Sequence, residues 1–168
     1  MKKTIFFLLI LIAANANAQV NDYTVTMEGI GAIKIDMKQD ELEKLLNKKI
    51  PLTNPWDTVS GAWYDSAKIK YKGIDLRIEF QRTYTAENSF YMRIIAMQTS
   101  SPLCKTRSGI CIGSDKLKII AAYEDNTLIV TKEAIIVRDN DEERMIIFNM
   151  INKKVVSVEI ATYFNDAE

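Results

Sequence analysis

Two segments of the chain, aligned at an offset of 77 residues, share several apolar positions and the same order of expected elements. Ile33 aligns with Ile110, Ile35 with Ile112 and Leu42 with Ile119. Residues 31–46 read GAIKIDMKQDELEKLL, and residues 108–123 read SGICIGSDKLKIIAAY. In each segment a short alternating stretch, typical of a β-strand, is followed by a polar turn and then by an amphipathic stretch with helical spacing. An internal repeat of this kind constrains the fold more strongly than any single residue does.

The stretches after each segment have the period of antiparallel strands. Residues 74–80 alternate between apolar and polar side chains, and Lys72-Gly73 before them predicts a hairpin turn. A helix with one apolar stripe and a sheet with one apolar face each need a partner that buries them. The sequence therefore predicts an α+β fold of two tandem repeats, each a short helix packed on an antiparallel β-sheet. We expect the first repeat at residues 19–98 and the second at residues 99–168.

The N-terminus has the pattern of an export signal. Lys2 and Lys3 precede ten apolar residues at positions 5–14, and Ala16-Asn17-Ala18 then supplies the small residues that signal peptidase accepts. No later apolar run approaches the roughly 18 residues that cross a bilayer. We expect residues 1–18 to be cleaved, and the mature chain to be periplasmic or secreted without stable insertion in a membrane.

Composition excludes several classes of function. The chain has 22 basic and 22 acidic side chains, so it lacks the basic excess that drives binding to nucleic-acid phosphates. It has no histidine, which excludes histidine-based triads and histidine metal ligands. The acidic run at residues 139–143 is expected to be a solvated hairpin turn; a weak calcium site is the alternative, although the spacing of a calcium loop is missing. We expect no enzyme activity, no cofactor, no metal site and no nucleic-acid partner.

The chain has two cysteines, Cys104 and Cys111. In an exported protein, two cysteines close together in the sequence favour a disulfide, and Gly109 between them can help the chain to reverse. Two independent buried thiols are the alternative. A catalytic redox pair is disfavoured because the spacing is not that of a C-x-x-C motif.

Aromatic side chains gather in the first half, where a loop-like stretch at residues 51–66 contains both tryptophans. Trp and Tyr bury a large area with little loss of rotamer entropy, so they often anchor protein interfaces. The polar side of the 74–80 strand adds a charged surface. An alternative is that the tryptophans fold back over the sheet as a small additional core. The candidate binding residues are Trp56, Asp57, Trp63, Tyr64 and Arg77.

Residues 31–46 resemble a motif of small exported bacterial modules, in which a G-x-I-x-(I/L)-G-M strand and turn precede a short helix ending in L-L. Those modules include the beta-lactamase inhibitor protein family and envelope lipoproteins of the outer-membrane assembly machinery. Residues 108–123 match better at the turn, because Gly113 stands where the motif has glycine and Asp36 replaces it in the first segment. The resemblance implies tandem helix-on-sheet units. It assigns no binding residue, because fold does not carry function.

These features favour a non-catalytic exported protein that binds another protein in the cell envelope, as an inhibitor or immunity-type partner of an enzyme. One alternative is an envelope assembly or structural adaptor that pairs with a partner by strand addition at a sheet edge. Another is a small-ligand or glycan-binding module, in which Trp56 and Trp63 stack on sugar rings.

Overall fold

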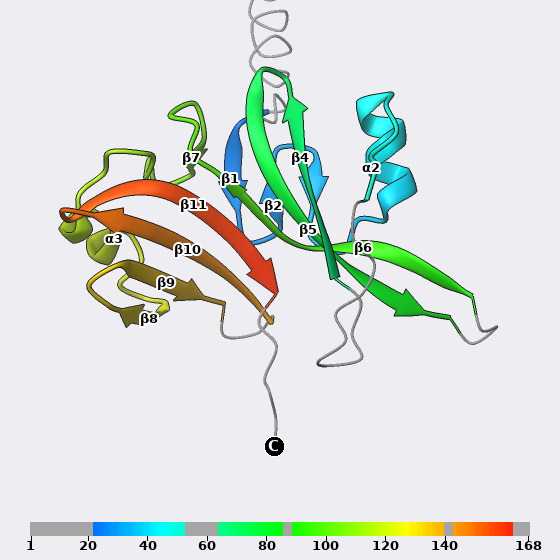
Figure 1. Ribbon diagram of the computed structural model, residues 1–168. Coiled ribbons are helices and arrows are strands. Elements are labelled where there is room, and N and C mark those ends of the chain that lie inside the picture. Colours follow the sequence, from blue (N-terminus) through cyan, green and yellow to red (C-terminus); the bar gives the residue numbers. More distant parts are fainter. Residues whose placement is uncertain (1–21, 53–63, 86–88, 140–142, 163–168) are drawn as a thin grey trace, which may run out of the picture.

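The computed structural model describes residues 22–52, 64–85, 89–139 and 143–162 (Figure 1). These residues form a mixed α+β structure that is mostly sheet. It contains two helices and two sheets within the described ranges. None of the helices in these ranges is long and apolar enough to cross a membrane.

The larger sheet has seven strands, and every neighbouring pair in it is antiparallel. Figure 1 shows that it twists strongly, so that β4 and β5 run across the direction of β10 and β11. In spatial order the strands are β4 (Tyr64–Tyr71), β5 (Ile74–Tyr84), β6 (Phe90–Thr99), β11 (Lys154–Thr162), β10 (Arg144–Ile151), β9 (Ala134–Arg138) and β8 (Thr127–Val130). The sheet thus continues across the boundary predicted at residues 98–99, through the pairing of β6 with β11.

The smaller sheet has four short strands, and its β7 is parallel to β1. In spatial order these are β3 (Ile33–Lys34), β2 (Gly29–Ile30), β1 (Thr24–Thr26) and β7 (Lys105–Thr106). The small sheet therefore joins the N-terminal segment to the chain that follows β6.

One hydrophobic core holds both sheets and both helices together. Helix α2 (Gln39–Leu46) contributes Leu42, and helix α3 (Lys116–Ala122) contributes Ile119, both fully buried. They lie in one cluster with Val25 of the small sheet and with Phe80 and Phe148 of the large sheet. Figure 1 shows α2 on the side of β4–β6 and α3 on the side of β9–β11.

The turns before the two helices make matching backbone contacts. Residues 36–37 exchange two hydrogen bonds with Ile94, of 2.8 and 3.0 Å, and residues 113–114 exchange two with Val155, also of 2.8 and 3.0 Å. The first residue of each turn has a positive φ, 68° in the first turn and 85° in the second. Each turn therefore fixes the start of a helix against a strand of the large sheet.

Asp36, a possible cap of α2 from its position, has a different role in the structure. The helix begins after Lys38, whose backbone N–H donates to the Glu41 carboxylate at 3.2 Å. The Asp36 carboxylate instead lies 2.7 Å from Arg93 Nη1 and 3.3 Å from Arg144 Nη2. It thus connects β6 to β10, two strands that are not neighbours in the sheet.

The strand pattern confirms the hairpin at Lys72-Gly73, across which Tyr71 pairs with Ile74. The stretch at 51–66 that was expected to be loop-like gives way to β4 at Tyr64, and β5 continues beyond the alternating residues 74–80 to Tyr84. Cross-strand contacts explain the longer β5: the Arg82 guanidinium lies 3.8 Å from the centroid of the Phe90 ring, and Tyr84 meets that ring edge-on.

Candidate functional site

The large sheet has one face that both helices and the small sheet cover, and a second face that carries polar and partly exposed side chains. The strand registers place one row of this second face across all seven strands. From β4 to β8 the row is Lys68, Arg77, Gln98, Glu159, Ile147, Ile136 and Ile129. We call the surface around this row the open face. It is basic at β4, where Lys68 and Lys70 lie, and carries Arg77 between Asp75 and Glu79 at β5. It is polar at β6 and β11, and apolar from β10 to β8.

The centre of the open face is a hydrogen-bonded polar cluster. Gln98 Nε2 donates to Glu159 Oε2 and to Ser157 Oγ, each at 3.4 Å, and Asn149 Nδ2 donates to the same hydroxyl at 3.1 Å. Burial raises the pKa of Glu159 above its usual range, and the nearby Glu79 carboxylate adds to the shift. A partly desolvated carboxylate at this point favours contact with a cationic group of a partner.

A groove of about 680 Å³ borders the basic end of the open face. Lys68, Lys70 and Arg77 line it from β4 and β5, and Lys48 lines it from the segment after α2. Gln98 and Ser157 lie at its inner end, next to the central cluster. The groove therefore joins the basic and the polar parts of the face.

Two of the five predicted binding residues lie on the open face. Tyr64, 37% exposed, begins β4, and its hydroxyl accepts a hydrogen bond from Gln81 Nε2 at 3.4 Å. Arg77 is exposed on β5 and lies 3.2 Å from the Glu79 carboxylate. The other three, Trp56, Asp57 and Trp63, lie outside the described residues.

Sequence reasoning missed Lys68, Lys70, Gln98 and Glu159 as members of the site. The two lysines had a readable signal, because residues two apart on a strand share a face. Alternation along its strand places Glu159 on the outward face, but no local signal brings Gln98 beside it, since only the pairing of β6 with β11 does so.

The predicted disulfide is absent from the structure, in which Cys104 and Cys111 are both free thiols. Their sulfurs have different neighbours: Cys104 is fully buried and hydrogen-bonds with the Thr99 side chain, whereas Cys111 Sγ lies 3.8 Å from Ser114 Oγ. Burial raises the pKa of the Cys104 thiol, which lowers its fraction of reactive thiolate.

We expect Cys111 to react with a thiol reagent in the native protein and Cys104 to react only after unfolding. The physical reason is that Cys104 is both buried and held as the thiol, whereas Cys111 is partly exposed. Titration with Ellman's reagent before and after addition of guanidinium measures this, with Cys111→Ser as the control that removes the native signal. Two unreactive cysteines in guanidinium without reductant would instead demonstrate the disulfide.

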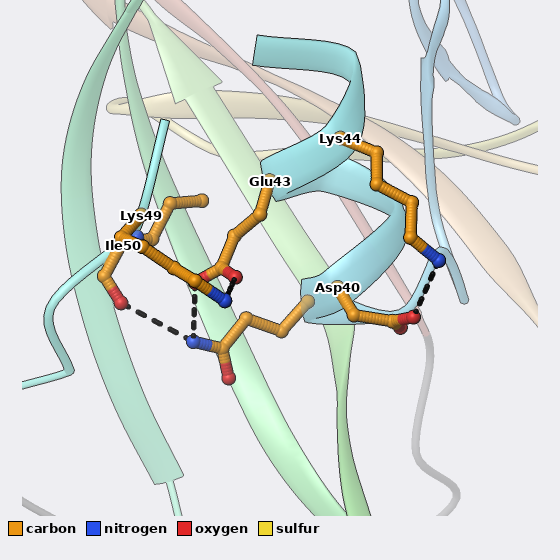
Figure 2. A network of polar contacts seen from close by, with 6 residues as sticks. Asp40, Glu43, Lys44, Lys49 and Ile50 are labelled. Carbon is orange, nitrogen blue, oxygen red and sulfur yellow. Dashed lines mark hydrogen bonds and ion pairs between the residues drawn. The ribbon is translucent and has the colours of Figure 1, made fainter. Parts of the chain in front are cut away.

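The Glu43 carboxylate holds the segment after α2 in place beside β4 through contacts with Gln39, Lys49 and Ile50, which we call the carboxylate clasp (Figure 2). Glu43, whose side chain is 11% exposed, accepts the Ile50 N–H at 3.0 Å and the Lys49 ammonium at 2.6 Å. Gln39 Nε2 donates to the Glu43 carboxylate and to the Ile50 carbonyl, each at 3.2 Å. The Ile50 N–H and the Lys49 ammonium lower the pKa of Glu43 below its usual 4.5. The clasp positions Lys48 at the groove.

Glu43→Gln is expected to destabilise the protein at neutral pH and to matter little in acid. The lowered pKa means that the folded state gains stability from the ionised carboxylate above about pH 4.5, and loses it as the pH falls through the folded-state value. Thermal unfolding of wild type and variant between pH 7 and pH 3 tests this, with the curves converging in acid. Asp40→Asn on the same helix removes only the exposed pair with Lys44 and serves as the control. An equal effect of both substitutions would show that the clasp does not stabilise the segment.

Comparison with known proteins gives no match to a family model, to a curated protein or to a solved structure. Within the described ranges, no group of three or more Cys, Asp or Glu side chains is placed to hold a metal ion. The resemblance to the inhibitor-like modules thus rests on the two sequence segments.

Proposed function

We propose that this chain is an exported, non-catalytic protein that binds another protein in the cell envelope through the open face, as an inhibitor or immunity-type partner of an enzyme. The observation that carries the proposal is the graded chemistry of that face, which offers cations, a polar centre and an apolar end on one continuous sheet. Protein interfaces combine these kinds of surface, with hydrophobic contacts beside charged and hydrogen-bonding groups.

The apolar end supplies exposed area that a partner could bury. Ile129 is 37% exposed on β8, and Ile136 and Ile147 are partly exposed beside it on β9 and β10. Burying apolar area contributes about 25 cal/mol per Å² before the costs of association. The charged end at Arg77 would orient the partner and exclude competitors of the wrong sign.

We further infer that the two halves are copies of one helix-on-sheet unit. The helices begin at Gln39 and Lys116, which the offset of 77 residues aligns, and both follow a turn with the same two hydrogen bonds. In both hairpins a register shift comes directly before the residue that pairs with Ile94 or Val155. These matches support a duplication in which the last strands of the two units, β6 and β11, pair with each other.

The signal sequence supports the envelope location in this proposal. Cleavage after Ala18 would leave Gln19 as the first residue of the exported chain. N-terminal sequencing of the protein recovered from a periplasmic extract tests this, and an intact Met1 on the recovered protein would contradict it.

The binding proposal is tested by capture of partners from an envelope extract, with the tagged, exported chain as bait and mass spectrometry as the readout. One stoichiometric enzyme, retained by wild type, is the expected result. Arg77→Glu and Trp56→Ala should each reduce retention of this enzyme. A residue that is a hot spot of the interface should lose about 2 kcal/mol or more of binding free energy, which is about a thirtyfold increase in Kd. Lys132→Glu, a charge reversal in the turn between β8 and β9, is the matched control. Equal retention by Arg77→Glu and Lys132→Glu would remove the open face from the proposal.

The position of β8 favours a second candidate, an assembly adaptor that pairs with its partner by strand addition. β8 pairs only with β9, so one of its edges is free within the described structure, and Thr127, Ile129 and Val130 on it are exposed. An unpaired edge with exposed apolar side chains is a template for another strand. The Thr131 N–H bonds to Ala134 across the β8–β9 turn, so the alternate N–H of Val130 lies on the free edge. Val130→Pro would therefore remove a donor that strand addition needs, while capture that survives it would favour the open face.

A further inference from the structure

The strongest unassigned feature is a band of cations along the edge of β4 that pairs with no other strand among the described residues. The groove of about 680 Å³ meets a second one of about 330 Å³, which lies between β4 and the segment after α2. Both are lined by Lys48, Lys68 and Lys70; Arg77 lines the larger one and Lys49 the smaller one. We call these five residues the basic band. The chain as a whole has equal numbers of basic and acidic side chains, so the band is a local concentration of charge.

Most of these cations are available to a ligand. Lys48 and Lys68 have no acidic partner among the described residues, and Lys70 lies 3.9 Å from Asp75 in an exposed pair. Exposed pairs of this kind contribute little, so a partner carboxylate can replace Asp75 at small cost. Lys49 and Arg77 are the exceptions, because Lys49 lies 2.6 Å from the Glu43 carboxylate and Arg77 lies 3.2 Å from the Glu79 carboxylate.

The spacing of the cations indicates the shape of the ligand. Lys68 and Lys70 are two residues apart on one strand, so their side chains leave the same face about 7 Å apart. Alternate side chains of an extended peptide have the same separation. Arg77 lies directly opposite Lys68 on β5, which widens the row rather than closing it into a pocket. A compact anion such as phosphate is best bound by convergent donors, and these cations are spread along an edge instead.

We infer that the basic band binds an extended acidic segment of a protein partner, with carboxylates at alternate positions that contact Lys68 and Lys70. This inference rests on the proposed function, since it names the chemistry of the partner that the open face binds. A segment bound along the edge of β4 also reaches the open face. The larger groove is lined both by the two lysines of β4 and by Arg77, Gln98 and Ser157 of the open face.

The test measures binding of labelled peptides to the full-length exported chain by fluorescence polarisation. The probe is a peptide of alternating Glu and Thr. The comparison peptides are one of the same composition with all Glu residues in one block and one of alternating Lys and Thr. We expect the alternating acidic peptide to bind best, and its affinity to fall as the salt concentration rises to physiological values.

Lys68→Glu/Lys70→Glu is expected to weaken binding of the alternating acidic peptide by about tenfold or more. Lys105→Glu/Lys132→Glu changes the net charge by the same amount away from the band and should leave binding unchanged. Lys68→Gln/Lys70→Gln, with a thermal melt of each variant, separates loss of binding from loss of folding. Equal binding by the two charge-reversed variants would overturn the inference, as would displacement of the peptide by inorganic phosphate or dextran sulfate at lower concentration.

The same variants distinguish this inference from the binding proposal. Capture of an envelope protein by wild type and equally by Lys68→Glu/Lys70→Glu would overturn the acidic-segment inference and leave the open face as the binding surface. Loss of capture in Lys68→Glu/Lys70→Glu, with capture retained in Lys105→Glu/Lys132→Glu, would support both. Greater aggregation without any change in binding would show that the lysines only protect the edge strand, and would overturn the inference.

Discussion

Replacement of Gly29 by alanine is expected to destabilise the protein by about 4 kcal/mol or more, a large part of the stability of a domain of this size. Gly29 begins β2 at φ 150° and pairs with Lys34 of β3. A Cβ at this position would overlap the Ile33 carbonyl oxygen and lie 2.9 Å from the Lys34 Cα. Both are backbone atoms, so no side-chain rotation relieves the overlap, and β2 must separate from β3.

Gly73→Ala is the matched control for this prediction. Gly73 has φ 88° in the turn between β4 and β5, but a Cβ there meets nothing within 4 Å. The control therefore carries the conformational penalty alone, about 1–2 kcal/mol. Urea denaturation followed by circular dichroism measures both variants. Similar midpoints would show that the close approach of β3 to Gly29 is not what requires glycine.

Phe148→Ala is expected to cost about 3–5 kcal/mol, because it removes a large side chain from the centre of the core. Phe148 is fully buried on β10, and its ring centroid lies 5.9 Å from that of Tyr123 at the end of α3. Its strand neighbours Ile135 and Val158 are fully buried as well, so little can move to fill the space.

Ile151→Ala on the same strand provides the comparison, since Ile151 is 62% exposed and its truncation should cost less than about 0.5 kcal/mol. Phe148→Leu should lie between the two, as it keeps part of the volume. Chemical denaturation of the three variants at one pH gives the order. A Phe148→Ala protein as stable as Ile151→Ala would contradict the placement of α3 on β10.

Local sequence patterns predicted the elements that depend on neighbours along the chain. The alternation at residues 74–80 and the Lys72-Gly73 pair gave the β4–β5 hairpin, because period two and a two-residue turn are local signals. Helix α2 was predicted from the amphipathic spacing within residues 31–46; in the structure it ends at Leu46, and Asn47 after it adopts φ 49°. The mixed α+β class followed from these elements.

Contacts between distant residues could not be predicted in the same way. Asp36 has the side chain of a helix cap, but Arg93 and Arg144 offer two charge-assisted hydrogen bonds that no local pattern reveals. Cys104 and Cys111 have a spacing that permits a bridge, yet burial of Cys104 beside Thr99 depends on where β7 meets β1.

The candidate site shows the same division. Arg77 was placed on a polar sheet face by alternation alone, and the structure places it there. Lys68 and Lys70 were not recognised as its neighbours, because the loop predicted up to residue 66 left too short a strand to establish its register. Gln98 and Glu159 could not be recognised as neighbours from the sequence, because only the pairing of β6 with β11 brings them together.

The pairing of β6 with β11 also determines when the large sheet can be completed during synthesis of the chain. The last described strand, β11, lies in the middle of the large sheet, with β6 on one side and β10 on the other. During synthesis from the N-terminus, β6 is made long before residues 154–162 leave the ribosome, and until then one of its edges lacks its final partner. The part of this edge that β11 covers, at residues 96–99, includes Ala96 and Met97 and is a site where nascent chains associate with one another. A chain with this topology therefore benefits from a holding chaperone until its final strand has been synthesised.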